Sequence, residues 1–121
     1  MSRPPVRLVD WGNSLQAISC PNCNEDYMHQ SDVAVFVRGE DGDSVKVITV
    51  SADGGVHEAV IDNSVSLNPS RRRHGLRISF WCEHCSYELS EEEKERGARS
   101  DSVPDLAIFQ EKGITYIQWV D

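Results

Sequence analysis

Two cysteine pairs of identical spacing constrain this chain more than any other feature of its sequence. They are Cys-Pro-Asn-Cys at 20–23 and Cys-Glu-His-Cys at 82–85, and the sequence has no other cysteine. Two intervening residues let a tight turn direct both sulfurs toward one point, and two facing turns then form a tetrahedron of thiolates. The spacing therefore predicts one structural zinc ion, with the ligands Cys20, Cys23, Cys82 and Cys85.

Other uses of paired cysteines fit this sequence less well. A redox pair needs surroundings that stabilise a thiolate, whereas Glu25 and Asp26 follow the first pair and would disfavour one. Structural disulfides are typical of secreted proteins, but residues 1–10 contain no apolar segment typical of a signal peptide. We therefore expect a cytoplasmic protein. An iron–sulfur cluster would use the same four ligands and is the less favoured alternative to zinc.

Four thiolates fill the coordination shell of a zinc ion. No position is left for water or a substrate, so the ion is expected to stabilise the fold and not to catalyse a reaction. We do not expect His29 or His84, near the two pairs, to be ligands. Asn24 follows the first pair and tolerates a positive φ, whereas Ser86 follows the second pair and tolerates it less. The two turns are therefore expected to differ in geometry.

Alternation of apolar and polar residues recurs along the chain, while helical periodicity is almost absent. This pattern predicts one mainly β domain over residues 1–121, an antiparallel sheet closed by the zinc site. Gly39, Gly42 and Gly113 are expected to supply turns between strands. Residues 90–104, which are rich in acids, are expected to form an exposed linker. The predicted strands are 15–20, 33–38, 45–50, 56–61, 76–81, 106–109 and 114–120.

The charge distribution bears on the choice of partner. The chain has 12 basic and 20 acidic side chains and a formal net charge of −8, which repels the nucleic-acid backbone. If the protein imitates nucleic acid, the acidic stretch 88–105 is the place to look. One basic cluster is a candidate for binding nucleic acid or another anion, and the alternative is a solvated loop that balances nearby acids. Its members are Arg71, Arg72, Arg73 and Arg77.

The cysteine pairs, with Phe-Trp-Cys-Glu-His-Cys at 80–85 and the terminal segment 110–119, give the sequence a resemblance to known proteins. It resembles zinc-ribbon proteins and, more loosely, small uncharacterised proteins encoded by bacteriophages and prophages. The resemblance implies an antiparallel β fold closed by a four-cysteine site, located in the host cytoplasm or the virion if the chain is phage-encoded. Zinc ribbons serve in transcription, RNA processing, ribosomes and protein docking, so the resemblance implies no single function.

We expect the function to be non-catalytic docking on another protein. The sequence has no nucleophile elbow, phosphate-binding glycine loop or HExxH motif, and nothing in it indicates a small-molecule substrate. It has no apolar run or long amphipathic helix suited to a membrane. Tyr116 and Trp119 are candidate protein contacts, unless they are ordinary half-buried sheet aromatics. Nucleic-acid binding through residues 71–77 is the alternative function.

Overall fold

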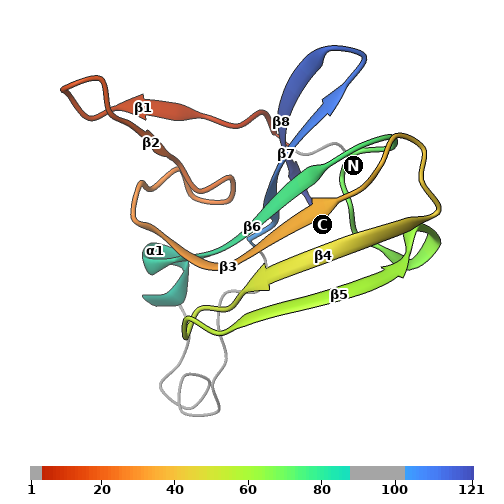
Figure 1. Ribbon diagram of the computed structural model, residues 1–121. Coiled ribbons are helices and arrows are strands. Elements are labelled where there is room, and N and C mark those ends of the chain that lie inside the picture. Colours follow the sequence, from red (N-terminus) through yellow and green to blue (C-terminus); the bar gives the residue numbers. More distant parts are fainter. Residues whose placement is uncertain (1–3, 88–102) are drawn as a thin grey trace.

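The computed structural model describes residues 4–87 and 103–121, which form a mainly β structure of antiparallel strands (Figure 1). A six-stranded sheet has the order β5-β4-β3-β6-β7-β8, and β1 and β2 form a separate two-stranded ribbon. The antiparallel β fold predicted from the sequence is confirmed. The elements are β1 Leu8–Asp10, β2 Gln16–Ile18, β3 Met28–Val37, β4 Ser44–Val50, β5 Val56–Asp62, η1 Asn63–Val65, β6 Gly75–Cys82, α1 Glu83–Tyr87, β7 Asp105–Glu111 and β8 Ile114–Val120.

The predicted strands are all present, with different ends in most cases. β3 begins at Met28 and not at residue 33, because a bulge between Gln30 and Val33 interrupts the pattern of alternation there. β1 was not expected, since three residues are too few to show a period of two. α1 was not expected either, because a helix of five residues has no apolar stripe.

The glycines expected to supply turns lie in the connections between strands. Lys112 and Gly113 connect β7 to β8 with φ of 52° and 78°, as the positive φ expected at Gly113 requires. Between β3 and β4 the positive φ belongs to Asp41, at 56°, and not to Gly39 or Gly42. Gly39 and Gly42 do lie in this turn, as expected, and the Gly42 N–H donates to the Gly39 carbonyl at 2.9 Å. The short polar side chain of Asp41 tolerates the left-handed region.

One side of the six-stranded sheet carries mostly apolar residues. Residues that are paired across strands, and every second residue along a strand, share a side. The registers between the strands therefore define one continuous surface across all six, which we call the apolar face. Its apolar members are Val33, Val35, Val37, Ile48, Val50, Val56, Val60, Leu76, Ile78, Phe80, Leu106, Ile108, Ile117 and Trp119.

The loop between β5 and β6 covers part of the opposite side of the sheet. Gly75 begins β6 beneath this loop, where a Cβ atom would lie 2.2 Å from Asn68 Oδ1 and 2.6 Å from Pro69 Cδ. Arg77 on the same side donates to the Leu67 carbonyl at 3.2 Å. Buried side chains on this side include Phe36 and Ala107. The loop thus packs closely on the sheet where glycine makes room.

The predicted linker 90–104 and the acidic stretch 88–105 both lie mostly outside the described residues. The last two positions of the linker are described, and both Val103 and Pro104 are buried. Val103 packs with Cys20 and Cys82. The linker prediction was therefore wrong for these two residues, because Val103 contributes to the core around the cysteines.

Candidate metal centre

Pairing of β3 with β6 brings the two cysteine turns together. The first turn lies between β2 and β3, and the second begins where β6 ends and α1 starts (Figure 1). Met28, at the start of β3, is paired with Cys82, and the backbone N–H of Glu83 donates to the Tyr27 carbonyl at 3.1 Å. Residues far apart in sequence therefore meet at one end of the sheet.

The four sulfurs have the spacing of a tetrahedral metal site. They all lie within 4.8 Å of one another, with 3.9 Å between Cys20 Sγ and Cys85 Sγ and 3.5 Å between Cys23 Sγ and Cys82 Sγ. Zinc–sulfur bonds of about 2.3 Å in a tetrahedron require about 3.8 Å between sulfurs. A disulfide needs about 2.05 Å, and all four cysteines are free. The donor set therefore fits one tetrahedral ion such as zinc.

The first turn depends on a left-handed residue after its second cysteine. Asn24 has φ of 65°, and its backbone N–H donates to the Cys20 carbonyl at 2.9 Å. The backbone N–H of Asn22 donates to Cys20 Sγ at 3.4 Å. Asn is among the few residues that tolerate this region. The role predicted for Asn24 is confirmed.

The second turn has a different geometry, as expected. Residues 83–87 form α1, so Cys85 lies within a helical turn and not in a left-handed loop. Its backbone N–H donates to Cys82 Sγ at 3.5 Å. A helical turn needs no positive φ, which explains why Ser86 can follow this pair without strain.

Burial makes thiolates costly in this cluster without a cation. Burial raises the pKa of Cys23 to about 11, and the thiols of Cys82 and Cys20 add to the increase against the backbone N–H of Glu25. Burial also raises the pKa of Cys85, again with help from neighbouring thiols. Burial acts in the same sense on Cys82, but the N–H of Cys85 and the neighbouring sulfurs outweigh it and lower its pKa. A positive charge at the centre of the cluster would favour the thiolate forms of Cys23 and Cys85.

The surroundings of the cluster are apolar. Cys20 and Cys82 are fully buried, and Met28, Phe80 and Val103 pack around the cluster. Four sulfur ligands leave a tetrahedral ion no open position for water. The arrangement can hold a metal ion as a cross-link between the two turns.

The histidines near the cysteines have other contacts. His29 stacks on Trp81 with ring centroids 4.0 Å apart, and its Nε2 lies 3.4 Å from Glu83 Oε1. His84 is exposed. Among the described residues, the group of potential ligands consists of the four cysteines alone.

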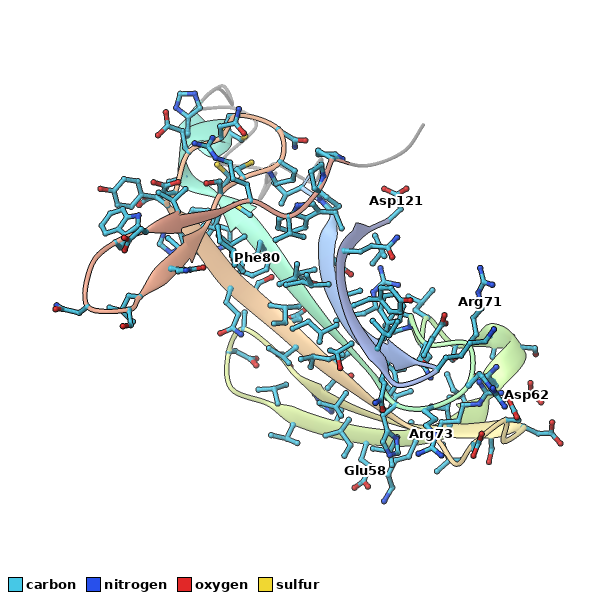
Figure 2. The ribbon with its side chains drawn as sticks, turned by 90° about the horizontal axis from the view of Figure 1, so that it is seen from above. Glu58, Asp62, Arg71, Arg73, Phe80 and Asp121 are labelled. Atoms are coloured by element: carbon cyan, nitrogen blue, oxygen red, sulfur yellow. The ribbon has the colours of Figure 1, made fainter. Side chains whose placement is uncertain are left out.

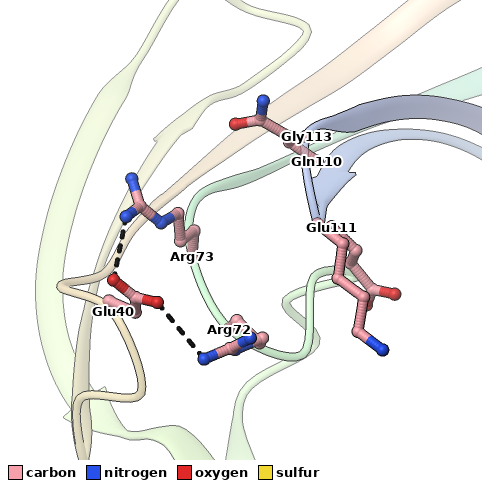
Figure 3. Close-up of a pocket in the computed structure, with 7 residues that line it drawn as sticks. Glu40, Arg72, Arg73, Gln110, Glu111 and Gly113 are labelled. Carbon is pink, nitrogen blue, oxygen red and sulfur yellow. Dashed lines mark hydrogen bonds and ion pairs between the residues drawn. The ribbon is translucent and has the colours of Figure 1, made fainter.

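The four candidate arginines have different environments. Arg72 and Arg73 both pair with Glu40, at 3.2 and 2.9 Å, in a hollow of about 240 Å³ (Figure 3). Arg72 also pairs with Asp41 at 3.1 Å, and this contact holds the pKa of the Asp41 carboxyl below its usual value. These ion pairs match the alternative in which a solvated loop balances nearby acids.

Arg77 is separate from the exposed arginines. Its guanidinium is buried and contacts Asp105 Oδ2 at 3.0 Å and the backbone carbonyl of Asp121 at 2.6 Å. Arg71 is exposed. It lines a second hollow of about 360 Å³ together with Tyr116. The fold therefore does not gather the four arginines into one open patch.

The two aromatic candidates also differ. Trp119 is 1% exposed and packs edge-on against Phe80 with centroids 6.1 Å apart, so it belongs to the core and not to a surface. Tyr116 is partly exposed and stacks on Phe109. Four exposed apolar side chains near the first turn were missed, although Trp11 in an irregular polar stretch was a visible signal. They are Leu8, Trp11, Leu15 and Tyr27.

No protein-family model matches the sequence, and no curated protein or solved structure shows a significant match to it. None of the described helices is long and apolar enough to cross a bilayer. The assignment of the metal centre rests on the geometry of the four cysteines.

Proposed function

We propose that this chain is a non-catalytic, zinc-stabilised module that docks on another protein. Stabilisation by zinc is supported by the four cysteine sulfurs, which lie within 4.8 Å of one another. A zinc ion with four thiolate ligands has no site for a reacting group, so its contribution is to stability. The resemblance to small phage-encoded proteins points to a partner in a phage or its bacterial host, in the cytoplasm or the virion.

The metal would anchor the N-terminal ribbon to the sheet. Cys20 follows β2, and Ser19 Oγ donates to Asp26 Oδ1 at 2.8 Å across the first turn. Figure 1 shows the β1–β2 ribbon extending away from the six-stranded sheet. A ribbon that packs little on the body of the protein depends on the cross-link at its base for its position.

The ribbon and the adjoining turn have the composition of a docking surface. Leu8, Trp11, Leu15 and Tyr27 are each at least half exposed, and the rings of Trp11 and Tyr27 meet edge to face at 6.0 Å. Tryptophan and tyrosine are enriched among residues that dominate binding energy. The partner would offer an apolar pocket to this surface, with strand pairing as an additional contact.

The test compares two leucines that have the same exposure. Leu15 is 64% exposed on the ribbon, and Leu67 is 66% exposed on the loop after η1. We expect zinc-loaded protein to retain a stoichiometric protein partner after nuclease treatment. The Leu15→Ser variant should lose that partner, while Leu67→Ser should keep it.

The same preparations test the metal and the alternative function. Elemental analysis should find one zinc per chain in the wild type and in His29→Ala and His84→Ala, and none in Cys82→Ser. Iron in place of zinc would contradict the assignment. If nuclease treatment releases the captured material, nucleic-acid binding is favoured instead. If Leu15→Ser and Leu67→Ser retain the protein partner equally, the ribbon is not the contact surface.

A further inference from the structure

The apolar face of the sheet has no complete covering layer in the described part of the chain. Trp119 and Leu106 are buried at the end near the cysteines. Six other side chains of the face, however, are between 37% and 66% exposed: Val35, Val37, Val50, Val56, Val60 and Ile117. Sheets of globular domains normally bury their apolar side against a second layer. Large continuous apolar surfaces on a monomer usually mark an interaction site.

The chain has little apolar sequence left with which to cover this face. Residues 1–3 and 88–102, which lie outside the described ranges, include only Met1, Leu89 and Ala98 as apolar residues. The loop between β5 and β6 packs on the other side of the sheet. Neither the β5–β6 loop nor the composition of these segments offers an apolar layer for this face, which favours a cover from another molecule.

The size of the face suits an interface between two proteins. Figure 2 shows β4 and β5 on one side of the β3–β6 pair and the β7–β8 hairpin on the other, with Phe80 beside β6. Six strands of about seven residues span about 23 Å by 24 Å, or roughly 550 Å² in projection. Because Trp119 and Leu106 are already buried at one end, two such faces in contact would remove up to about 1,100 Å² from water, close to the roughly 1,000 Å² that a biological interface should exceed.

The charge on the face indicates which partner fits. Lys46 and Glu58 lie within it and pair with each other at 2.6 Å, and Asp62 lies at its rim, where it accepts from the Ser64 N–H. The face is therefore nearly neutral, although the whole chain has a formal charge of −8. A basic partner would gain little here, whereas two acidic copies can meet at this face with less repulsion than elsewhere.

We propose that a second copy of this chain covers the apolar face. The two sheets would pack face to face about a two-fold axis and form a sandwich, with the same residues contributed by each copy. The β1–β2 ribbon is not part of the six-stranded sheet, so a different partner can bind it. This interface is thus separate from the docking surface proposed above.

The mass of the zinc-loaded protein in solution is the first measurement. Sedimentation equilibrium from low to high micromolar concentration should give twice the chain mass of 13.6 kDa. A chain that stays monomeric at the highest concentration overturns the proposal. The proposal is also overturned if the protein captures a different protein and the Val50→Glu variant does not. In that case the captured protein, and not a second copy, covers the apolar face.

A matched pair of variants locates the interface. Val50 on the apolar face is 41% exposed, and Tyr116 on the opposite side is 43% exposed. An unpaired carboxylate in the interface should weaken the dimer about 100-fold or more, so Val50→Glu should be monomeric. Tyr116→Glu should stay dimeric. Equal dissociation by both, or by neither, would overturn the proposal, and circular dichroism of each variant checks that it folds.

Charge exchange gives a second, independent test. Lys46→Glu should weaken the dimer at least tenfold, because it leaves four carboxylates facing one another across the two-fold axis. The double exchange Lys46→Glu with Glu58→Lys should restore it. Lys112→Glu makes the same change in net charge at the β7–β8 turn and should have little effect. Weakening by Lys112→Glu equal to that by Lys46→Glu would mean that general repulsion and not the face controls assembly.

Discussion

Arg71 and Arg77 lie six positions apart in the sequence but differ in burial and in their contacts. Arg77 is buried, and its guanidinium joins β6 to Asp105 of β7 and to the backbone of Asp121. Arg71 is exposed, and the contacts described for it are those of its backbone, to Glu111 Oε1 and to Arg38. A cluster read from sequence alone gives no indication of which of its members faces the interior.

This difference predicts different costs of substitution. Arg77→Met removes one partner of a buried ion pair and should lower the free energy of unfolding by about 3 kcal/mol. Arg71→Met should change it by no more than about 0.5 kcal/mol. Urea denaturation of the zinc-loaded variants measures both. Similar values for the two would contradict the structural role of Arg77.

The ion pair between Asp41 and Arg72 is expected to make stability depend on pH. Arg72 donates from Nε and Nη2 to its carboxylate at 3.3 and 3.1 Å, and these contacts lower its pKa from the usual 3.8. A depressed pKa means that the contribution to stability is present above pH 3.8 and is lost as the pH falls through the lowered native value. The pair should therefore stay intact at neutral and mildly acidic pH.

Titration of the Asp41 carboxyl by NMR checks this directly. In Arg72→Ala its pKa should return toward 3.8, and in Arg71→Ala it should stay low, since Arg71 does not contribute to the shift. An unchanged pKa in Arg72→Ala would show that the ion pair is absent in solution.

At the scale of elements, Gly75 sets how closely the β5–β6 loop can approach β6. The added methyl of Gly75→Ala would overlap Asn68 Oδ1 and the Pro69 ring, so the loop must shift. We expect a loss of about 1–3 kcal/mol in the free energy of unfolding. Gly39→Ala is the control, because its Cβ would meet nothing within 4 Å. Thermal unfolding of both distinguishes a packing constraint from a general effect of replacing glycine.

The strands could be predicted because most are long enough for alternation to be visible. β4 and β8 consist largely of β-branched and aromatic residues, and the sequence predicts them nearly as they are. β1 and α1 could not be predicted, since each holds fewer than two full repeats of the pattern that would reveal it. The left-handed Asp41 was missed because glycine is the stronger local signal for a turn.

At the scale of the whole molecule, the cysteine cluster could be predicted but not the way it is assembled. The equal spacing of the pairs identifies the four ligands, and their sulfurs meet as expected. The sequence does not show that β3, after the first turn, pairs with β6, while β2, before it, pairs with β1. Nor does it show that residues 4–87 and 103–121 leave much of one side of the sheet exposed, because burial depends on the register of all six strands.

Zinc should control the stability of the molecule as a whole. A ligand that binds only the folded state at 100 times its dissociation constant stabilises it by about 2.7 kcal/mol, which corresponds to about 10 °C in a domain of this size. The melting temperature should therefore rise with free zinc and fall when a strong chelator is added. A melting temperature that is independent of both would mean that the four cysteines do not bind a metal in the native state.

The long separation of the cysteine pairs also has a consequence for synthesis on the ribosome. Cys23 and Cys82 are 59 positions apart, and the turns meet only when β6 can pair with β3. At about 5–20 residues per second, the second pair leaves the ribosome about 3–12 s after the first. During that interval the nascent chain can offer a metal two sulfurs at most. The chain can therefore bind the ion tightly, and fix the position of the ribbon, only late in its synthesis.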